Sequence, residues 1–158
     1  MTNAPEQSRE SKPQILRDQL FMSPKIVLRK DSYGGYGVFA RERISKGELI
    51  EVSPYVPSMY RSKDLVHVSL RRHCWPEPCD CEMCKIRGRQ FMLCSGYLQM
   101  YNSSMEKEGE SVSLKWVQEA RVIEVVTTKK IPKDGELFLY YGEGYINALK
   151  KSMVPLTP

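Results

Sequence analysis

The pattern of apolar and polar positions along the chain predicts many short strands joined by glycine turns, with little sustained helical periodicity. The clearest strands are residues 112–117 and residues 120–127, and the second of these is nearly all β-branched. Further strand-like runs lie at residues 25–29, 38–40, 48–52, 65–68 and 89–93. We therefore expect a mainly β protein of the α+β class.

Residues 137–141, Leu-Phe-Leu-Tyr-Tyr, form an unbroken apolar and aromatic run, which predicts a buried strand. A Lys-Asp-Gly turn signal precedes this run, and Gly142 and Gly144 end it. Tyr141 therefore stands at the exit of a buried strand, beside glycines that let a ligand approach the backbone. Taken alone, these residues are better explained as an aromatic core strand with a glycine turn. Other parts of the sequence are needed to favour a reactive tyrosine.

The chain of 158 residues has the length of one domain with a substantial core. We predict a polar N-terminal arm at residues 1–23, a domain at 24–146 and a C-terminal tail at 147–158. Residues 54 to about 72 are irregular in pattern apart from the possible strand at 65–68, and residues 59–95 form a variable insertion that contains the cysteine cluster.

The composition, 41% hydrophobic and 27% charged, is that of a soluble globular protein. No apolar run is long enough to span a membrane, and the N-terminus has no signal-peptide core, so we expect an intracellular, soluble protein of the cytoplasm or nucleus with no membrane partner. The net charge of +5 is mild, and the sequence contains no run of basic residues. A nucleic-acid partner is therefore not indicated.

Four of the five cysteines lie within residues 74–84, namely Cys74, Cys79, Cys81 and Cys84. An odd number of cysteines without a secretion signal favours reduced thiols or a metal site over a disulfide framework. The pair Cys81 and Cys84 has the spacing of tetrahedral zinc sites. Two interpretations stay open, a structural zinc ion and a loop of unliganded thiols. His73 is interpreted as a surface residue.

A Gly-x-Gly segment at residues 35–37 follows the first predicted strand, as in dinucleotide-binding folds. The third glycine of that fingerprint is missing, no helical pattern follows, and no βαβ spacing is present. We therefore exclude a dinucleotide fold and interpret the segment as a hairpin whose glycines expose backbone N–H and C=O groups.

Three blocks nevertheless occur in a distinctive order. They are residues 35–40 with 44–50, residues 96–104, and residues 120–127 with 131–137 and the pair Tyr141-Gly142. In this order and spacing, the chain resembles the SET domain of protein-lysine methyltransferases, particularly the small stand-alone forms, over roughly residues 25–146. The resemblance implies small curved sheets of the β-clip type, with a C-terminal segment that passes under a loop as a pseudoknot.

The resemblance also implies a site. S-adenosylmethionine would bind at Gly35, Tyr36 and Gly37 and at the pair Asn102 and Ser103, and Tyr141 would be the catalytic residue. The substrate channel would be lined by Tyr101, Leu139, Tyr140 and Tyr145. Two departures stand out: Ser103 replaces the family's histidine, and the Pro-Asn pair that follows is absent. The family's C-terminal cysteine cluster is absent as well, so its zinc does not carry over.

The implied function is transfer of a methyl group from S-adenosylmethionine to a lysine amine of a protein substrate. The alternative is a catalytically weak or inactive module that keeps the fold and binds a protein partner through the cysteine loop and basic surface. Titration of the cofactor separates the two. In the family, a tyrosine two residues before the catalytic one limits methylation to one group. Leu139 stands at that position, so the sequence predicts products beyond monomethyl-lysine.

Overall fold

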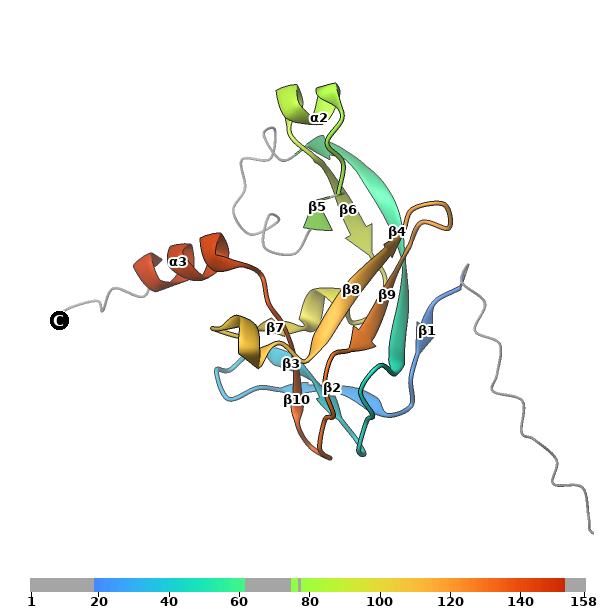
Figure 1. The fold of residues 1–158 in the computed structure, drawn as a ribbon, viewed down its shortest axis with the longest axis vertical. Helices are drawn as coiled ribbons and strands as arrows, with labels where there is room; N and C mark the ends of the chain where they lie inside the picture. Colours follow the sequence, from blue (N-terminus) through green and yellow to red (C-terminus); the bar gives the residue numbers. More distant parts are fainter. Residues whose placement is uncertain (1–18, 62–74, 77, 153–158) are drawn as a thin grey trace, which may run out of the picture.

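The computed structural model describes residues 19–61, 75–76 and 78–152, and in these residues the chain is mainly β (Figure 1). Two small, strongly curved sheets carry most of the ordered backbone, and short helical segments lie between the strands. The mainly β architecture predicted from the sequence is confirmed.

The larger sheet is built around strand β4 (Leu49–Arg61), which is long and curved (Figure 1). Within the described residues its strand order is β5-β6-β4-β9-β8, and β1 also pairs with β4. The other members of this sheet are β1 (Phe21–Met22), β5 (Trp75–Pro76), β6 (Gln90–Cys94), β8 (Val112–Val117) and β9 (Val122–Thr127). The pairing of β4 is antiparallel with β6 and with β9, and its register shifts near each end, which lets one strand serve both partners.

The smaller sheet has the order β2-β3-β10-β7. Its strands are β2 (Ile26–Lys30), β3 (Tyr36–Ala40), β7 (Asn102–Ser103) and β10 (Glu136–Leu139). The pairing of β10 is antiparallel with β3 and parallel with β7, so the C-terminal strand lies between two segments from much earlier in the chain. That central position is where the expected pseudoknot places the C-terminal segment.

The helical segments are short. Helix α2 (Glu82–Arg87) lies at one end of the molecule beyond β4 and β6, and α3 (Glu143–Ser152) projects from the side (Figure 1). Two single turns of 3₁₀ helix precede β7 and β8, namely η1 (Leu98–Met100) and η2 (Lys107–Gly109).

One apolar core joins the two sheets. Its fully buried members come from both, including Val38 of β3, Ile50 of β4, Ile123 of β9 and Leu137 of β10. Alternate residues of β10 face this core, so Leu137 and Leu139 are buried while Phe138 is only half-buried. Because a strand alternates its side chains between two faces, Leu139 and the residues beside it are positioned by the packing of the core.

Two local predictions were wrong. The irregular stretch expected after residue 53 is instead the continuation of β4 through two prolines, with the carbonyl of Pro54 accepting a hydrogen bond of 2.9 Å from Ser95 N–H. The tail expected from residue 147 is the second half of α3, which begins after Gly142 at φ 90° and packs through the buried Ile146. Tertiary packing overrides the glycines and prolines that suggested otherwise. The strand predicted at 65–68 and residues 153–158 lie outside the described residues.

In the part of the chain that the structure describes, no helix has the length and apolar character needed to cross a membrane.

Candidate active site

Strand β10 lies between the two segments that the sequence analysis identified, the glycine segment at residues 35–37 and the segment that contains Asn102. On one side Leu137 pairs with Val38, next to Gly37, and on the other Phe138 pairs with Asn102. Gly37 and Asn102 are therefore neighbours across a strand that comes from the far end of the sequence. The hairpin predicted around residues 35–37 is present as the β2–β3 pair.

Asn102 is the centre of a polar cluster. Its side-chain Nδ2 donates hydrogen bonds to Glu136 Oε1 at 2.7 Å, to Asp31 Oδ2 at 3.0 Å and to the Tyr36 carbonyl at 3.4 Å. Three acceptors around one atom identify that atom as the amide nitrogen. Two carboxylates thus converge on a single neutral donor, which leaves negative charge at this point and favours a cationic ligand.

Position 37 requires glycine because neighbouring side chains leave no room for a Cβ atom, and not because of its backbone conformation. Its φ lies outside the left-handed region, but an added Cβ would lie 2.9 Å from Asn102 Nδ2 and closer still to the carboxylate of Glu136. Gly35 is less crowded, with an added Cβ at 3.1 Å from Asp31 Oδ2. Only a residue without a side chain lets the backbone approach the polar cluster this closely.

Asp31 shapes the loop that carries these glycines. Its Oδ1 accepts hydrogen bonds from the N–H groups of Tyr33 at 2.9 Å and Gly35 at 2.8 Å, which is an Asx-type turn. Partial desolvation raises the pKa of Asp31, but hydrogen bonds from Gly35, Asn102 and Tyr33 outweigh it and hold the pKa below its usual value. Asp31 therefore stays ionised.

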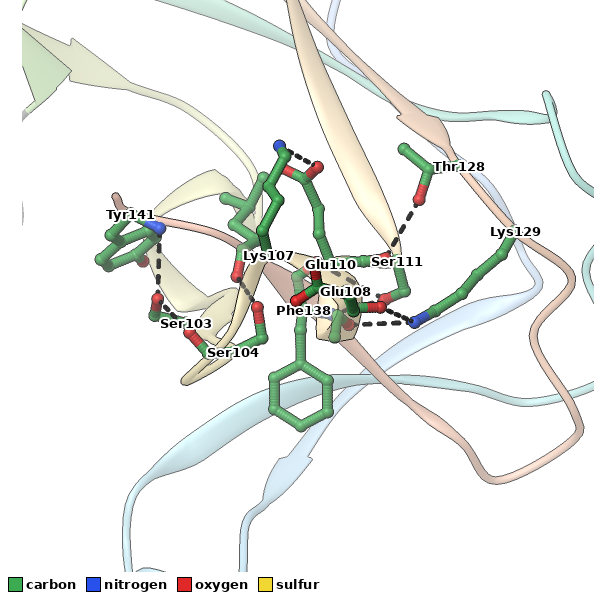
Figure 2. A network of polar contacts seen from close by, with 12 residues as sticks. Ser103, Ser104, Lys107, Glu108, Glu110, Ser111, Thr128, Lys129, Phe138 and Tyr141 are labelled. Atoms are coloured by element: carbon green, nitrogen blue, oxygen red, sulfur yellow. Dashed lines mark hydrogen bonds and ion pairs between the residues drawn. The ribbon is translucent and has the colours of Figure 1, made fainter. Parts of the chain in front are cut away.

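Tyr141 lies just beyond the end of β10 and is half-buried. Its hydroxyl donates a hydrogen bond of 2.6 Å to the backbone carbonyl of Tyr101. Its own N–H donates to Ser103 Oγ at 3.2 Å (Figure 2). Burial, and then the neighbouring Tyr145, raise the pKa of Tyr141 well above its usual value. The phenol is therefore neutral at physiological pH and held at both its backbone and its hydroxyl.

A comparison with protein-family models identifies the family of this domain. A profile of the SET domain family matches residues 35–142, which is more than half of the chain and includes Gly35, Gly37, Asn102 and Tyr141. The chain belongs to the SET domain family. Members of that family are typically S-adenosylmethionine-dependent lysine methyltransferases.

Solved structures agree with this SET domain assignment. A candidate histone methyltransferase of Plasmodium falciparum is similar with a TM-score of 0.55 at 27% identity, covering 77% of this chain and 96% of the other. The methyltransferase domain of human PR domain-containing protein 2 has a TM-score of 0.54 at 19% identity, covering 90% of this chain and 95% of the other, and it supports the fold alone. No curated protein sequence matches this chain.

In this SET domain, aromatic rings surround Tyr141 on more than one side. The ring of Trp75 meets it edge to face at a centroid distance of 5.3 Å, and the ring of Tyr145 does so at 4.9 Å. Tyr145 is 38% exposed and stands at the outer end of this group. The three rings form an aromatic wall that presents apolar faces and edges around the Tyr141 side chain.

The other residues expected in a substrate channel occupy different surroundings. Tyr101 is 1% exposed, and its hydroxyl donates a 2.8 Å hydrogen bond to Glu51 Oε2, so its backbone carbonyl rather than its ring meets Tyr141. Leu139 is buried in the core, and its carbonyl accepts a 2.7 Å hydrogen bond from Ser104 N–H. Tyr140 is half-buried, with the ammonium of Lys107 at 5.5 Å from its ring centroid.

Ser103, expected from the resemblance at the position of the family's histidine, contacts the backbone of Tyr141. Its Oγ accepts the N–H of Tyr141 and donates to the Ser104 carbonyl at 3.0 Å (Figure 2). On the same side of the small sheet, Ser111 Oγ accepts a 2.7 Å hydrogen bond from Phe138 N–H. The side chains of Ser103 and Ser111 therefore accept backbone hydrogen bonds from Tyr141 and Phe138, in and just after β10.

Sequence reasoning missed four residues of this site: Asp31, Glu51, Trp75 and Glu136. An aspartate two residues before a tyrosine and a pair of glycines is a known Asx-turn pattern, so Asp31 had a local signal. Glu136 lies inside a matching block but carries no local mark of its contact with Asn102. Glu51 and Trp75 reach the site only through contacts across the larger sheet, which leave no trace in the local pattern.

The cysteine segment forms a separate cluster. The Sγ atoms of Cys79, Cys81 and Cys84 all lie within 4.8 Å of one another, and such a triad can hold a metal ion. These three residues and Cys94 form no disulfide among the described residues. Cys74, the fourth cysteine of the predicted group, lies outside the described residues, as does His73, which was interpreted as a surface residue.

Proposed function

We propose that this SET domain is a protein-lysine N-methyltransferase that uses S-adenosylmethionine. The observation that carries the proposal is the anchored hydroxyl of Tyr141, held at 2.6 Å from the Tyr101 carbonyl on the segment that follows β10, while β10 itself adjoins Gly37 and Asn102. The 27% identity with a candidate histone methyltransferase over most of the chain supports the same reaction class.

The residues around Asn102 fit the cofactor. S-adenosylmethionine supplies a methyl group on a positively charged sulfur and also carries an α-ammonium group. The space that a Cβ at Gly37 would fill lies against Asn102 Nδ2 and the carboxylate of Glu136, and Asp31 is on the other side of the amide. Two carboxylates favour a cation at this point, and glycine lets it approach the backbone. We assign the cofactor's ammonium end to this cluster, with Gly35, Tyr36 and Ser103 as its neighbours.

Tyr141 would orient the reacting groups. Its single hydroxyl hydrogen is committed to the Tyr101 carbonyl, so the lone pairs of the same oxygen remain available to accept a hydrogen bond from the lysine amine or a contact from the methyl group. The raised pKa of Tyr141 keeps this oxygen neutral. A fixed neutral acceptor positions the amine without withdrawing the proton that holds the phenol in place.

The aromatic wall would help to make the lysine a nucleophile. An amine attacks the methyl group only in its neutral form, and apolar surroundings lower the pKa of a lysine ammonium by removing it from water. Trp75 and Tyr145 supply such surroundings through edge-to-face contacts with the ring of Tyr141.

The first test is calorimetric titration with S-adenosylmethionine. The unmodified chain should bind, and Asn102→Ala should weaken binding by about 1–3 kcal/mol because it removes the donor between two carboxylates. Asn147→Ala is a matched control, since Asn147 is exposed on α3 away from the cluster. No binding by the unmodified chain would overturn the cofactor assignment.

The second test is the reaction itself. Lysate proteins incubated with the chain and with methyl-labelled cofactor should acquire label at lysine side chains, identified by mass spectrometry. Cofactor binding without any labelled lysine would favour the alternative of an inactive binding module over the enzyme.

A further inference from the structure

The cysteine triad lies beyond β5, with Cys79 and Cys81 before α2 and Cys84 within it. Cys79 and Cys84 are half-buried and Cys81 is exposed. The three sulfurs lie within 4.8 Å of one another, close enough for one ion to contact all of them. In a tetrahedral zinc site with Zn–S bonds of about 2.3 Å, neighbouring sulfurs are about 3.8 Å apart, so a small inward movement brings the three sulfurs to the spacing of one face of the tetrahedron.

A fixed positive charge stands beside the triad. Arg61, at the end of β4, donates from Nη1 to Cys84 Sγ at 3.5 Å and to the Gly88 carbonyl at 3.1 Å. Three thiolates with one divalent ion carry a net charge of −1, which the guanidinium offsets. The carboxylate of Asp80, which lies between Cys79 and Cys81 in the sequence, forms an ion pair with Arg89 at 2.6 Å.

We propose that Cys79, Cys81 and Cys84 bind a structural Zn²⁺ ion through their three thiolates. Binding breaks no covalent bond other than S–H: each thiol that is protonated beforehand releases one proton to solvent as its Zn–S bond forms. The three ligands are distinct from the residues proposed to carry out methyl transfer, so zinc binding can be tested separately from that function.

The ion would fix the segment that carries Trp75. That residue pairs with Met92 across β5 and β6, and its ring lies against Tyr141. Pro78, between Trp75 and the triad, accepts a 3.2 Å hydrogen bond through its carbonyl from Gln118 Nε2. A closed triad shortens the free length of chain beyond Trp75 and thereby holds the aromatic wall in place.

The direct test is elemental analysis of the full chain purified without chelator. We expect about one equivalent of zinc, lost in the variant with Cys79, Cys81 and Cys84 all changed to serine and retained in Cys94→Ser, a cysteine of β6 outside the triad. Less than half an equivalent in the unmodified chain, or equal zinc in the triad variant, overturns the proposal. A disulfide within the triad, found by mass spectrometry of the purified protein, overturns it too.

Two measurements on unmodified cysteines guard against a variant that fails to fold. Replacement of zinc by Co²⁺ should give the absorption of a tetrahedral thiolate-bound ion, and its absence contradicts the site. In a Trp116→Phe background, where Trp75 is the remaining tryptophan, zinc added to the metal-free chain should shift the emission to shorter wavelength. An unchanged spectrum would contradict the closure of the segment. Both readouts are independent of methyl transfer.

Discussion

The hydroxyl of Tyr141 donates a hydrogen bond of 2.6 Å to the backbone carbonyl of Tyr101, a residue 40 positions earlier in the chain. The side chain of Tyr101 in turn donates to Glu51, which is fully buried and also accepts from Ser53 Oγ at 2.5 Å and Tyr97 N–H at 2.8 Å. The position of the catalytic candidate therefore depends on a buried polar network that extends into the larger sheet.

Removal of the hydroxyl tests the role of Tyr141 directly. Tyr141→Phe should keep the aromatic wall and lose the oxygen that orients the amine, so we expect methyl transfer to fall by about 100-fold or more. The Tyr101 carbonyl loses its partner, which should cost about 1 kcal/mol of stability. Single-turnover rates and urea unfolding measure the two effects. Tyr33→Phe, at an exposed tyrosine of the β2–β3 loop, is the control and should change neither.

Gly37→Ala tests the cradle at Asn102. An added Cβ would collide with Glu136 and Asn102 although the backbone of Gly37 is compatible with alanine, so we expect cofactor affinity to fall by about tenfold or more. Gly144→Ala is the matched control, because no atom lies within 4 Å of its Cβ position and alanine favours a helix. Calorimetry compares the two, and equal binding by both variants contradicts the assignment of the cradle.

Glu51 should make stability depend on pH. Burial raises the pKa of Glu51 above its ordinary value of 4.5, and hydrogen bonds from Ser53, Tyr101 and Tyr97 only partly oppose this. The folded chain therefore holds a proton that the unfolded chain has released, so stability from this group is present below pH 4.5 and is lost as pH rises through the raised pKa.

Glu51→Gln removes that titration. Relative to the variant, the unmodified chain should lose free energy of unfolding as the pH rises above 4.5, as measured by urea unfolding at several pH values. Parallel curves for the two proteins would show that Glu51 does not titrate in this range.

Leu139 should permit more than one methyl transfer to the same amine. Leucine has no hydroxyl that could anchor a blocking water, and it is buried beside the segment that carries Tyr141. Under excess cofactor we expect products beyond monomethyl-lysine. Leu139→Tyr should shift the product toward one methyl group, whereas Leu139→Phe should not.

The phenylalanine variant controls for size, because both substitutions overpack a core position at a cost of about 1–3 kcal/mol. Mass spectrometry of the product lysine gives the degree of methylation. If the unmodified enzyme stops at one methyl group, the interpretation of Leu139 is wrong.

Much of the secondary structure was determined by the sequence itself. The alternation and β-branched content of residues 112–117 and 120–127 predicted strands that the structure has at Val112–Val117 and Val122–Thr127. The Lys-Asp-Gly signal predicted the turn in which Asp134 has φ 64°. These features depend on residues close in the chain, where propensity and alternation act directly.

The tertiary structure alone decided where the long strand β4 ends, that residues 143–152 are helical, and which side chains meet at the site. Asn102 contacts Asp31 and Glu136, 71 and 34 positions away, and Glu51 contacts Tyr101, 50 positions away. No local pattern encodes such pairs, because they form only when the parallel pairing of β7 and β10 and the closure of the core bring distant segments together. The sequence alone was enough to identify Gly37, Asn102 and Tyr141 as candidate site residues. Their contacts with other side chains depend on the packing of distant segments.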